Sequence, residues 1–319
     1  MRDNSIGAWP AASKKTKSNS LLAEFLSRLL REKPLGTLGA VIVLILLLTG
    51  IFASVLAPYG MNEIHLEDRL KPPSAQYMLG TDDLGRDLLT RIIYGARISM
   101  YVGLGASTLL TAVATIVGIA SGFLGGTTDM MIQRLVDAWM CFPSLVIYLM
   151  VMALLGPGLT QVILVLGIVT GVHISRVVRG AIIGIKENIY LEAAKVIGCS
   201  NWRILGRHIL PNVMPVIIII FTTQFGYMII AEATLSFLGL GIPPPTPSWG
   251  GMLSGPGRQY MHLAPWIALW PGLALAIVVY AVNMLGDAVR DILDPRLRGG
   301  LARYGGVKVR KPKKREQDQ

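Results

Sequence analysis

Residues 36–55 read GTLGAVIVLILLLTGIFASV, a run of twenty residues without a charge. A helix of this length crosses the roughly 30 Å hydrocarbon core of a bilayer. The rest of the chain has the same character, because 52% of its 319 residues are hydrophobic, 15% are charged, and the mean hydropathy is +0.54. Soluble domains rarely have this composition. The sequence therefore predicts an all-α integral membrane protein.

Six apolar stretches approach the ~20 residues that a spanning helix needs. The third is the least regular, because Asp137 and Pro143 lie near its start. Small residues recur in the second and fourth, which lets helices approach closely. The predicted spans are Leu35–Leu56, Ile98–Phe123, Val136–Leu155, Thr160–Val178, Pro215–Leu240 and Ala264–Leu285. The predicted packing positions are Gly103, Gly105, Ala106, Ser107, Gly118, Gly167 and Gly171.

Basic residues are distributed unevenly between the two predicted sides. Of the 30 Lys and Arg residues, seven lie within Met1–Lys33 and ten between Arg290 and Arg315. Six more lie in or beside the loop between the fourth and fifth spans. Because cytoplasmic segments retain such an excess, we expect both termini to be cytoplasmic. The N-terminal stretch has no apolar core of its own, so it predicts a tail before a signal-anchor helix rather than a cleaved signal.

Several other functions are disfavoured by the sequence. The net charge of +11 does not indicate nucleic-acid binding, because the basic residues flank apolar spans and no aromatic platform accompanies them. The two cysteines, Cys141 and Cys199, predict no disulfide framework. Residues 180–187 come nearest to a Walker A loop but lack Gly-Lys-Ser/Thr. No catalytic or metal-binding motif is recognisable, so we expect neither a cofactor nor enzyme activity in this chain.

The predicted cytoplasmic stretch KENIYLEAAKVIGCSNWRILGRHILPNVMP, residues 186–215, is the most informative segment. Tyr190–Ile197 and Trp202–Ile209 each predict a short helix, with Gly198 ending the first. The Ser200-Asn201 pair is expected to cap the second helix. The small side chains of Ala193 and Ala194 would leave a slim surface. Two short helices projecting from a membrane bundle would form a knob able to dock into a partner's groove.

Two prolines follow these short helices. We expect Pro211 to end the second helix and Pro215 to start the next span, because proline suits a first helical turn and not a helix interior.

The spacing within this segment resembles the EAA signature of binding-protein-dependent ABC transporter permeases. In that family the segment is the coupling helix, which docks into the ATP-binding subunit and transmits its closure to the membrane bundle. Taken singly, Gly198 would be a helix cap, Glu192 an exposed charge and His208 an interfacial histidine, but their joint spacing favours the signature. The residues that match it are Glu192, Ala193, Ala194, Gly198, His208, Leu210, Pro211 and Asn212.

Three further stretches resemble dipeptide and oligopeptide permeases of the second-subunit type. They are LGTDDLGRD at 79–87, EATLSFLGLG at 232–241 with the proline-rich run that follows, and residues 286–298. The resemblance covers about residues 35–298 and implies the type I ABC importer permease bundle. Peptides are the implied substrates, although similar permeases carry nickel chelates, glutathione or other small solutes.

The resemblance also implies partners and a location. The partners would be a second homologous permease subunit, two ABC ATP-binding subunits and an extracytoplasmic solute-binding protein, assembled in a prokaryotic inner membrane. The chain would then divide into a cytoplasmic basic tail (1–34), a first transmembrane helix with an outer loop (35–97), a permease core (98–288) and a basic C-terminal tail (289–319). The core would include the coupling segment, residues 186–213.

Polar residues near the predicted outer face are candidates for contact with the binding protein or for the transport path. A metal site is an alternative for the three aspartates, but helix capping by Thr81 or Asp82, with arginine neutralising the carboxylates, accounts for them more simply. These candidates are Asp82, Asp83, Arg86, Asp87 and Trp249.

Glu232 is the one acidic residue well inside a predicted span, so it is either a pathway residue or a hydrogen-bonded packing residue. A pathway role predicts that Glu232→Gln impairs transport. For Gln161, His173 and Gln224, packing or interhelical hydrogen bonds suffice. Two other classes stay open on composition alone: a secondary transporter or channel, and an intramembrane enzyme. The signature disfavours the first, and the missing catalytic residues disfavour the second.

Overall fold

The computed structural model describes residues 21–293, so most of both predicted basic tails and the 294–298 part of the family resemblance lie outside it. The described residues are mainly helical and contain no β-strand. The helices are α1 Leu21–Glu32, α2 Pro34–Ile51, α3 Ala53–Leu56, α4 Leu88–Leu124, α5 Gly126–Met140, α6 Ser144–Leu155, α7 Leu159–Lys186, α8 Ile189–Val196, α9 Asn201–Ile204, α10 Leu210–Phe237, α11 Trp249–Ser254, α12 Pro256–Tyr260 and α13 Trp266–Leu293.

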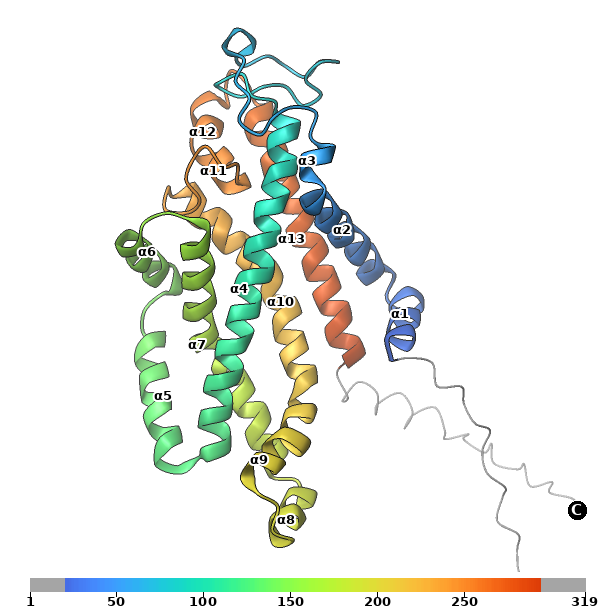
Figure 1. The fold of residues 1–319 in the computed structure, drawn as a ribbon, viewed down its shortest axis with the longest axis vertical. Helices are drawn as coiled ribbons and strands as arrows, with labels where there is room; N and C mark the ends of the chain where they lie inside the picture. Colours follow the sequence, from blue (N-terminus) through green and yellow to red (C-terminus); the bar gives the residue numbers. More distant parts are fainter. Residues whose placement is uncertain (1–20, 294–319) are drawn as a thin grey trace, which may run out of the picture.

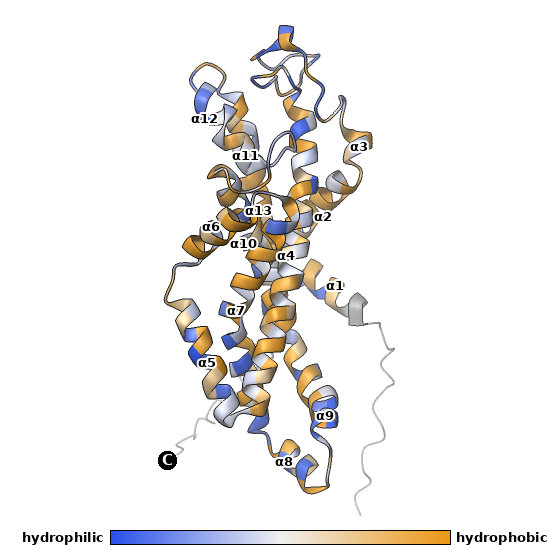
Figure 2. Ribbon diagram, turned by 60° about the vertical axis from the view of Figure 1, so that its left-hand side comes forward, coloured by the Kyte–Doolittle hydropathy of each residue, from blue (hydrophilic) through white to orange (hydrophobic). Residues whose placement is uncertain are grey.

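The long helices form an elongated bundle (Figure 1). Helix α4 packs along α7 and α10, and α13 packs between α10 and α2. One end of the bundle carries the 57–87 loop, α11 and α12, and the opposite end carries α8 and α9. Figure 2 shows hydrophobic colour along the long helices and hydrophilic colour gathering toward both ends. This is the pattern of a bundle whose middle faces lipid.

Five stretches are helical, long and apolar enough to cross a membrane: α2, α4, α7, α13 and the run from α9 through α10. A sixth results if α5 and α6 together count as one span. The prediction of about six spans is thus confirmed, but the prediction of one continuous third helix is wrong. The chain bends by 85° between α5 and α6, because Pro143 has an extended conformation and cannot continue a helix from Phe142.

Three helices extend well beyond their predicted ends. Helix α4 starts ten residues before Ile98, and α7 and α13 continue past their predicted last residues to Lys186 and Leu293. With 37 residues, α4 is about 55 Å long at 1.5 Å per residue, far more than the ~30 Å of hydrocarbon. Hydropathy marks only the part of such a helix that lipid surrounds.

Small residues bring α4 and α7 into close contact, as the sequence predicts. A Cβ atom at Gly118 would lie 2.6 Å from a Val178 carbon, and one at Gly171 would lie 2.7 Å from a Val113 carbon. Any larger side chain at these two positions would force the helices apart. Lipid tails are as apolar as the helix surfaces, so burial from lipid does little to hold helices together. Close packing of this kind supplies dispersion attraction instead.

Candidate functional site

Helices α8 and α9 form a helix–turn–helix at one end of the bundle. Helix α8 ends in a Schellman motif: Gly198 N donates to the Lys195 carbonyl and Cys199 N to the Ala194 carbonyl, both at 3.0 Å. Gly198 has φ +79°, a conformation that glycine adopts without strain. The Ser200 hydroxyl then accepts from Arg203 N and caps α9. The predicted first short helix and its glycine break are therefore confirmed, whereas the second helix starts as predicted but does not end at Ile209.

The tip of this segment carries an exposed apolar surface that the sequence reading missed. Val196 is 87% exposed and Trp202 is 83% exposed, and Ile189 and Ile197 are almost as open. Large apolar side chains gathered on a projecting end are typical of a protein–protein contact. The four side chains, Ile189, Val196, Ile197 and Trp202, are called the apolar tip below.

The two alanines of the signature have different environments. Ala193 and its neighbour Glu192 lie on the surface, whereas Ala194 is buried with Leu191 and Ile204 between the short helices. The prediction that both alanines form the docking surface is therefore wrong for Ala194. Its small side chain instead belongs to the buried core cluster that also contains Leu191 and Ile204.

The chain returns to the bundle without the predicted break at Pro211. Residues 205–209 form a wider π-helical turn that leads directly into α10, with Pro211 in the first turn of α10 and Pro215 within it. A proline clashes with the carbonyl four residues before it, and a wider turn gives that carbonyl room. Neither proline therefore ends the helix.

Tyr190 ties α8 to the start of α10. Asn212 Nδ2 donates to the Tyr190 hydroxyl at 3.3 Å and to the His208 carbonyl at 2.6 Å. The rings of Tyr190 and His208 lie 6.3 Å apart. The structure thus brings His208 and Asn212 together, and Leu210 adjoins them at the start of α10. The contribution of Tyr190 was missed because its partner lies 22 residues away.

At the opposite end, Asp82 is the centre of a buried ion-pair cluster. Its side chain is 3% exposed and accepts from the Arg86 Nε atom at 2.7 Å and from the backbone N–H groups of Leu84 and Arg86 at 2.9 Å. Arg91 Nε lies 3.5 Å from the same carboxylate, and Asp83 lies 3.8 Å from Arg86. Arginine therefore neutralises these carboxylates as predicted.

The cap of α4 is a different residue from the one predicted. Asp87, and neither Thr81 nor Asp82, accepts from the Thr90 backbone N–H, at 2.7 Å. The Thr81 hydroxyl accepts from Lys71 N at 2.8 Å instead and holds the 57–87 loop together. Asp87 is the cap because it directly precedes the first helical residue. From this position its carboxylate reaches the backbone N–H of the third helical residue, Thr90.

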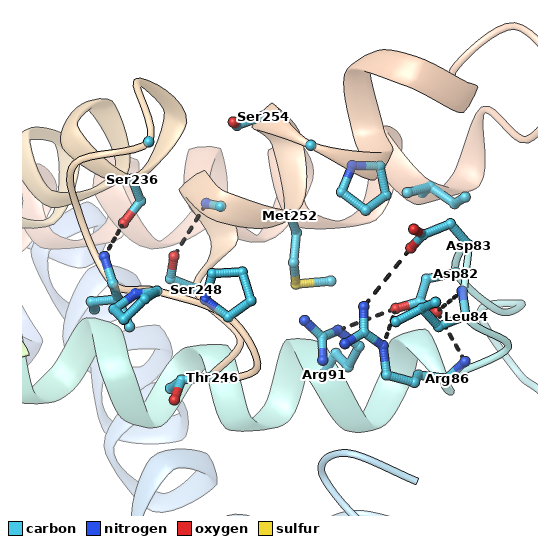
Figure 3. A pocket seen from close by; sticks show the side chains of 18 of the residues that line it. Asp82, Asp83, Leu84, Arg86, Arg91, Ser236, Thr246, Ser248, Met252 and Ser254 are labelled. Atoms are coloured by element: carbon cyan, nitrogen blue, oxygen red, sulfur yellow. Dashed lines mark hydrogen bonds and ion pairs between the residues drawn. The ribbon is translucent and has the colours of Figure 1, made fainter. Parts of the chain in front are cut away.

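This cluster forms one wall of a cavity of about 420 Å³. Figure 3 shows Asp82, Asp83, Arg86 and Arg91 on one side, with Met252 between them and the loop that carries Ser248. The Nη1 atom of Arg91 is buried without a hydrogen-bond partner among the described residues. The opposite wall comes from Ser236, Ile242, Pro243, Pro244, Thr246 and Ser248.

Trp249 is not available as an outer contact. It is 2% exposed, and its indole N–H donates to the Ile92 carbonyl at 3.2 Å. The ring lies against Gly95, where a Cβ atom would approach it to 2.6 Å. The prediction of a contact residue is therefore wrong, because the large apolar ring gains more from burial against α4 than from facing water.

Asp83 should make stability depend on pH. Burial, and then the neighbouring Asp82 carboxylate, raise the pKa of Asp83. A raised folded-state pKa means that its stabilising contribution is complete below the unfolded pKa and is lost as pH rises through the folded value. We expect Asp83→Asn to raise the free energy of unfolding of the detergent-solubilised protein at pH 7 by less than about 1 kcal/mol, because the group is partly solvated, and so to raise the thermal unfolding midpoint. The gain should shrink at pH 4.5, and a lower midpoint at pH 7 would contradict this.

Glu232 is a buried packing residue beneath α11. It is 0% exposed, lines neither cavity, and accepts from the Ser236 hydroxyl at 2.6 Å. Ser248 adjoins the same carboxyl group. The Ser236 hydroxyl also accepts from Ile242 N at 3.2 Å, so the carboxyl group anchors the loop after α10. This position supports the packing interpretation over the pathway interpretation.

We therefore expect Glu232→Gln to assemble and to transport within about twofold of wild type, because its carbonyl oxygen can still accept from Ser236. Glu232→Ala should lower the free energy of unfolding by about 2 kcal/mol or more, because it leaves a cavity and removes the hydrogen-bond acceptor of Ser236. Initial uptake rates and unfolding midpoints measure the two effects. Assembled Glu232→Gln transporter without uptake would restore the pathway role.

Comparison with known proteins agrees with the family resemblance seen in the sequence. Residues 114–299 match the family of binding-protein-dependent transport system inner membrane components. Residues 20–73 match the N-terminal transmembrane domain of oligopeptide transport permease C. Because the first match covers more than half of the chain, the protein belongs to this family. It is a multi-pass inner-membrane permease of the ABC importer class.

Its relatives are similar over most of their length. The chain is 40% identical over 269 residues to the dipeptide transport system permease protein DppC of Alkalihalophilus pseudofirmus, covering 84% of this chain and 88% of the relative. It is 38% identical to the glutathione transport system permease protein GsiD of Pectobacterium atrosepticum, covering 86% and 91%. An inward-facing structure of the MetNI methionine ABC transporter shares the fold, with a TM-score of 0.52, 16% identity, and coverage of 64% of this chain and 96% of that one.

Proposed function

We propose that this chain is one of two membrane subunits of an ATP-driven importer of short peptides, and that its α8–α9 segment docks into a separate ATPase. The apolar tip carries this proposal. Four large apolar side chains at the projecting end of a membrane bundle need a partner, and a folded protein outside the bilayer is the partner they suit.

In this proposal the coupling segment, residues 186–213, works as a rigid lever. Glu192, Ala193 and the apolar tip would contact the ATPase, while Gly198 shapes the turn between the two short helices. The Tyr190, His208 and Asn212 contacts, together with the continuous helix through Pro211, would pass the displacement into α10. Closure of two ATPase subunits would thus reorient two permease bundles around a shared path.

The proposed orientation places the α8–α9 end and both termini in the cytoplasm. Lys and Arg are concentrated in both terminal segments and near α8 and α9, which supports this orientation through the positive-inside rule. The permease core would comprise residues 98–288, preceded by the first transmembrane helix and outer loop at 35–97. Residues 1–34 and 289–319 would be cytoplasmic tails, although 21–32 of the first form helix α1.

The cavity beside the aspartate–arginine cluster would face the solute-binding protein on the opposite side. Its wall holds two aspartates and two arginines, so it offers partners for either sign of charge. Asp83 is its most accessible acid, whereas Asp82, Arg86 and Asp87 are largely committed to one another and to the backbone. We propose Asp83 and the rim at 243–246 as contacts, supported by Asp82 and Arg86.

Peptides are the proposed substrates because the relatives named above are dipeptide and glutathione permeases, and glutathione is itself a tripeptide. Nickel chelates and other small solutes are the alternatives within the family. Competition of unlabelled dipeptide, glutathione and nickel chelate against uptake of a labelled dipeptide would separate these substrates. We expect the dipeptide to compete most strongly.

The assembly is tested by tagging the chain, solubilising the membranes gently and identifying proteins recovered in stoichiometric amount. We expect a second permease and an ATPase. Recovery of the chain without an ATPase would favour a secondary transporter or channel and would overturn the proposed function.

A further inference from the structure

A second cavity lies between α6, α7 and α10 and has a volume of about 250 Å³. Apart from Ile174, every side chain that lines it is polar. These polar side chains are Ser144, Tyr148, Thr170, His173, Gln224 and Tyr227, and together they are called the midplane pocket.

The pocket lies halfway along the two longest helices that form it. His173 is the fifteenth of the 28 residues of α7, and Gln224 is the fifteenth of the 28 residues of α10. Both helices are spans by length and apolarity. Six polar groups from three helices thus meet within membrane-crossing segments, where an unpaired polar group is costly.

Internal hydrogen bonding does not account for the whole set. The hydroxyls of Tyr148 and Thr170 bond to each other at 2.8 Å, as packing residues do. The side chains of His173 and Gln224, in contrast, make no hydrogen bond to another side chain or carbonyl of the described part of the chain. Of the two explanations expected for these side chains, packing or interhelical hydrogen bonds, the second is therefore not seen among the described residues. Their polar atoms are left to face the cavity.

The break between α5 and α6 adjoins the same pocket. Pro143 is the non-helical residue that precedes α6, and Ser144, the first residue of α6, lines the cavity. Irregular backbone at membrane depth is tolerated where it is buried in protein or lines a water-filled cavity. Discontinuous helices of this kind accompany substrate sites in other transporters. The break and the polar lining are two independent observations that indicate one site.

The chemistry of the lining selects a neutral ligand rich in hydrogen-bonding groups. No Lys, Arg, Asp or Glu lines the pocket, and the adjacent charge on α7, Arg176, is paired with Asp137. Hydroxyl, imidazole and amide groups offer both donors and acceptors, as a peptide bond requires. The rings of Tyr148 and Tyr227 supply apolar walls. A fixed charge in the pocket would favour peptides with particular side chains, whereas this uncharged lining would accept peptides of any sequence.

We propose that the midplane pocket binds the amide backbone of a peptide in transit, with His173 and Gln224 as its unsatisfied hydrogen-bonding groups. The proposal rests on the function proposed above. At about 250 Å³ the pocket is smaller than the roughly 300–1,000 Å³ of a complete small-molecule site, so the second permease would supply the facing wall.

The test uses the complete transporter in proteoliposomes with its binding protein and ATP, and measures dipeptide uptake and ATP hydrolysis together. Gln224→Leu removes the amide at similar volume, and Gln161→Leu makes the same change on α7 outside the cavity. We expect Gln224→Leu to lower the peptide transported per ATP about fivefold or more, with binding-protein-stimulated hydrolysis retained. Gln224→Asn, which keeps an amide, should retain more uptake.

A second variant guards against a folding defect. Tyr227→Phe removes only a hydroxyl from a side chain that is already exposed, and should also lower the peptide transported per ATP. If Gln224→Leu and Tyr227→Phe both match Gln161→Leu while wild type imports peptide, the midplane pocket is overturned and the proposed function stands. If wild type imports no peptide with ATP, the proposed function itself fails, and this inference fails with it.

Discussion

Replacing Val196 and Trp202 with aspartate is expected to strip the ATPase subunits from the purified transporter and to abolish ATP-driven uptake. Both side chains are more than four-fifths exposed, so neither contributes much to the fold of this chain. At the centre of an interface each would be a hot spot of about 2 kcal/mol or more, and aspartate would add an unpaired buried charge. A combined loss of roughly 4 kcal/mol weakens association about a thousandfold.

The measurement is the recovery of ATPase with the tagged chain, relative to the recovery of the second permease. Leu263→Asp is the matched control, because it places the same charge on an exposed leucine between α12 and α13, at the opposite end of the bundle. We expect the control to retain the ATPase. An unchanged ATPase yield with the double variant would show that the α8–α9 tip is not the docking surface.

Replacing Asp82 with alanine is expected to destabilise the chain by about 3–5 kcal/mol, the usual cost of breaking a buried ion pair from one side. Its carboxylate neutralises Arg86 and Arg91, and it also accepts two backbone N–H groups of the turn before α4. Removing it leaves the guanidinium group of Arg91 without its ion-pair partner and leaves Arg86 with only Asp83, at 3.8 Å. The protein should accumulate poorly in the membrane and unfold at a clearly lower temperature.

Asp83→Ala is the natural comparison, since Asp83 is the adjacent residue of the same type. Its carboxylate is more exposed and lies 3.8 Å from Arg86, too far for a direct hydrogen bond. We expect Asp83→Ala to change the free energy of unfolding by less than about 1 kcal/mol at pH 7. The unfolding midpoint and the membrane abundance measure the stability of both variants. An equal loss of stability in Asp82→Ala and Asp83→Ala would show that the cluster is not organised around Asp82.

The spans and the turn between α8 and α9 were predictable because their signals are local. Twenty uncharged residues at 36–55 suffice to indicate a membrane helix, and Gly198 with Ser200 suffices to indicate the turn between α8 and α9. Hydropathy could not locate the ends of α4 or α7, because the added turns carry charged residues such as Arg91 and Lys186 that end an apolar run without ending a helix. It also missed the α5–α6 bend, where Pro143 outweighs apolar residues on both sides.

The sites were harder to predict because their partners are distant in sequence. Trp249 was read as an outer contact, but its hydrogen bond runs to residue 92. For His173 and Gln224 the sequence predicts packing or interhelical hydrogen bonds, because nothing in either helix alone reveals that both line one pocket with Tyr148. Which alanine of the signature faces outward also depends on the core cluster that buries Ala194, most of whose other members are distant in sequence.

The most direct test of an ATP-driven permease is peptide accumulation in proteoliposomes that contain this chain and its co-purified partners. Uptake is followed with ATP alone, with an ion gradient alone and after omission of the ATPase. We predict concentrative uptake that requires ATP, the ATPase and the binding protein, and that is insensitive to collapse of the ion gradient. Uptake that persists without the ATPase and follows the ion gradient would contradict the account and identify a secondary transporter.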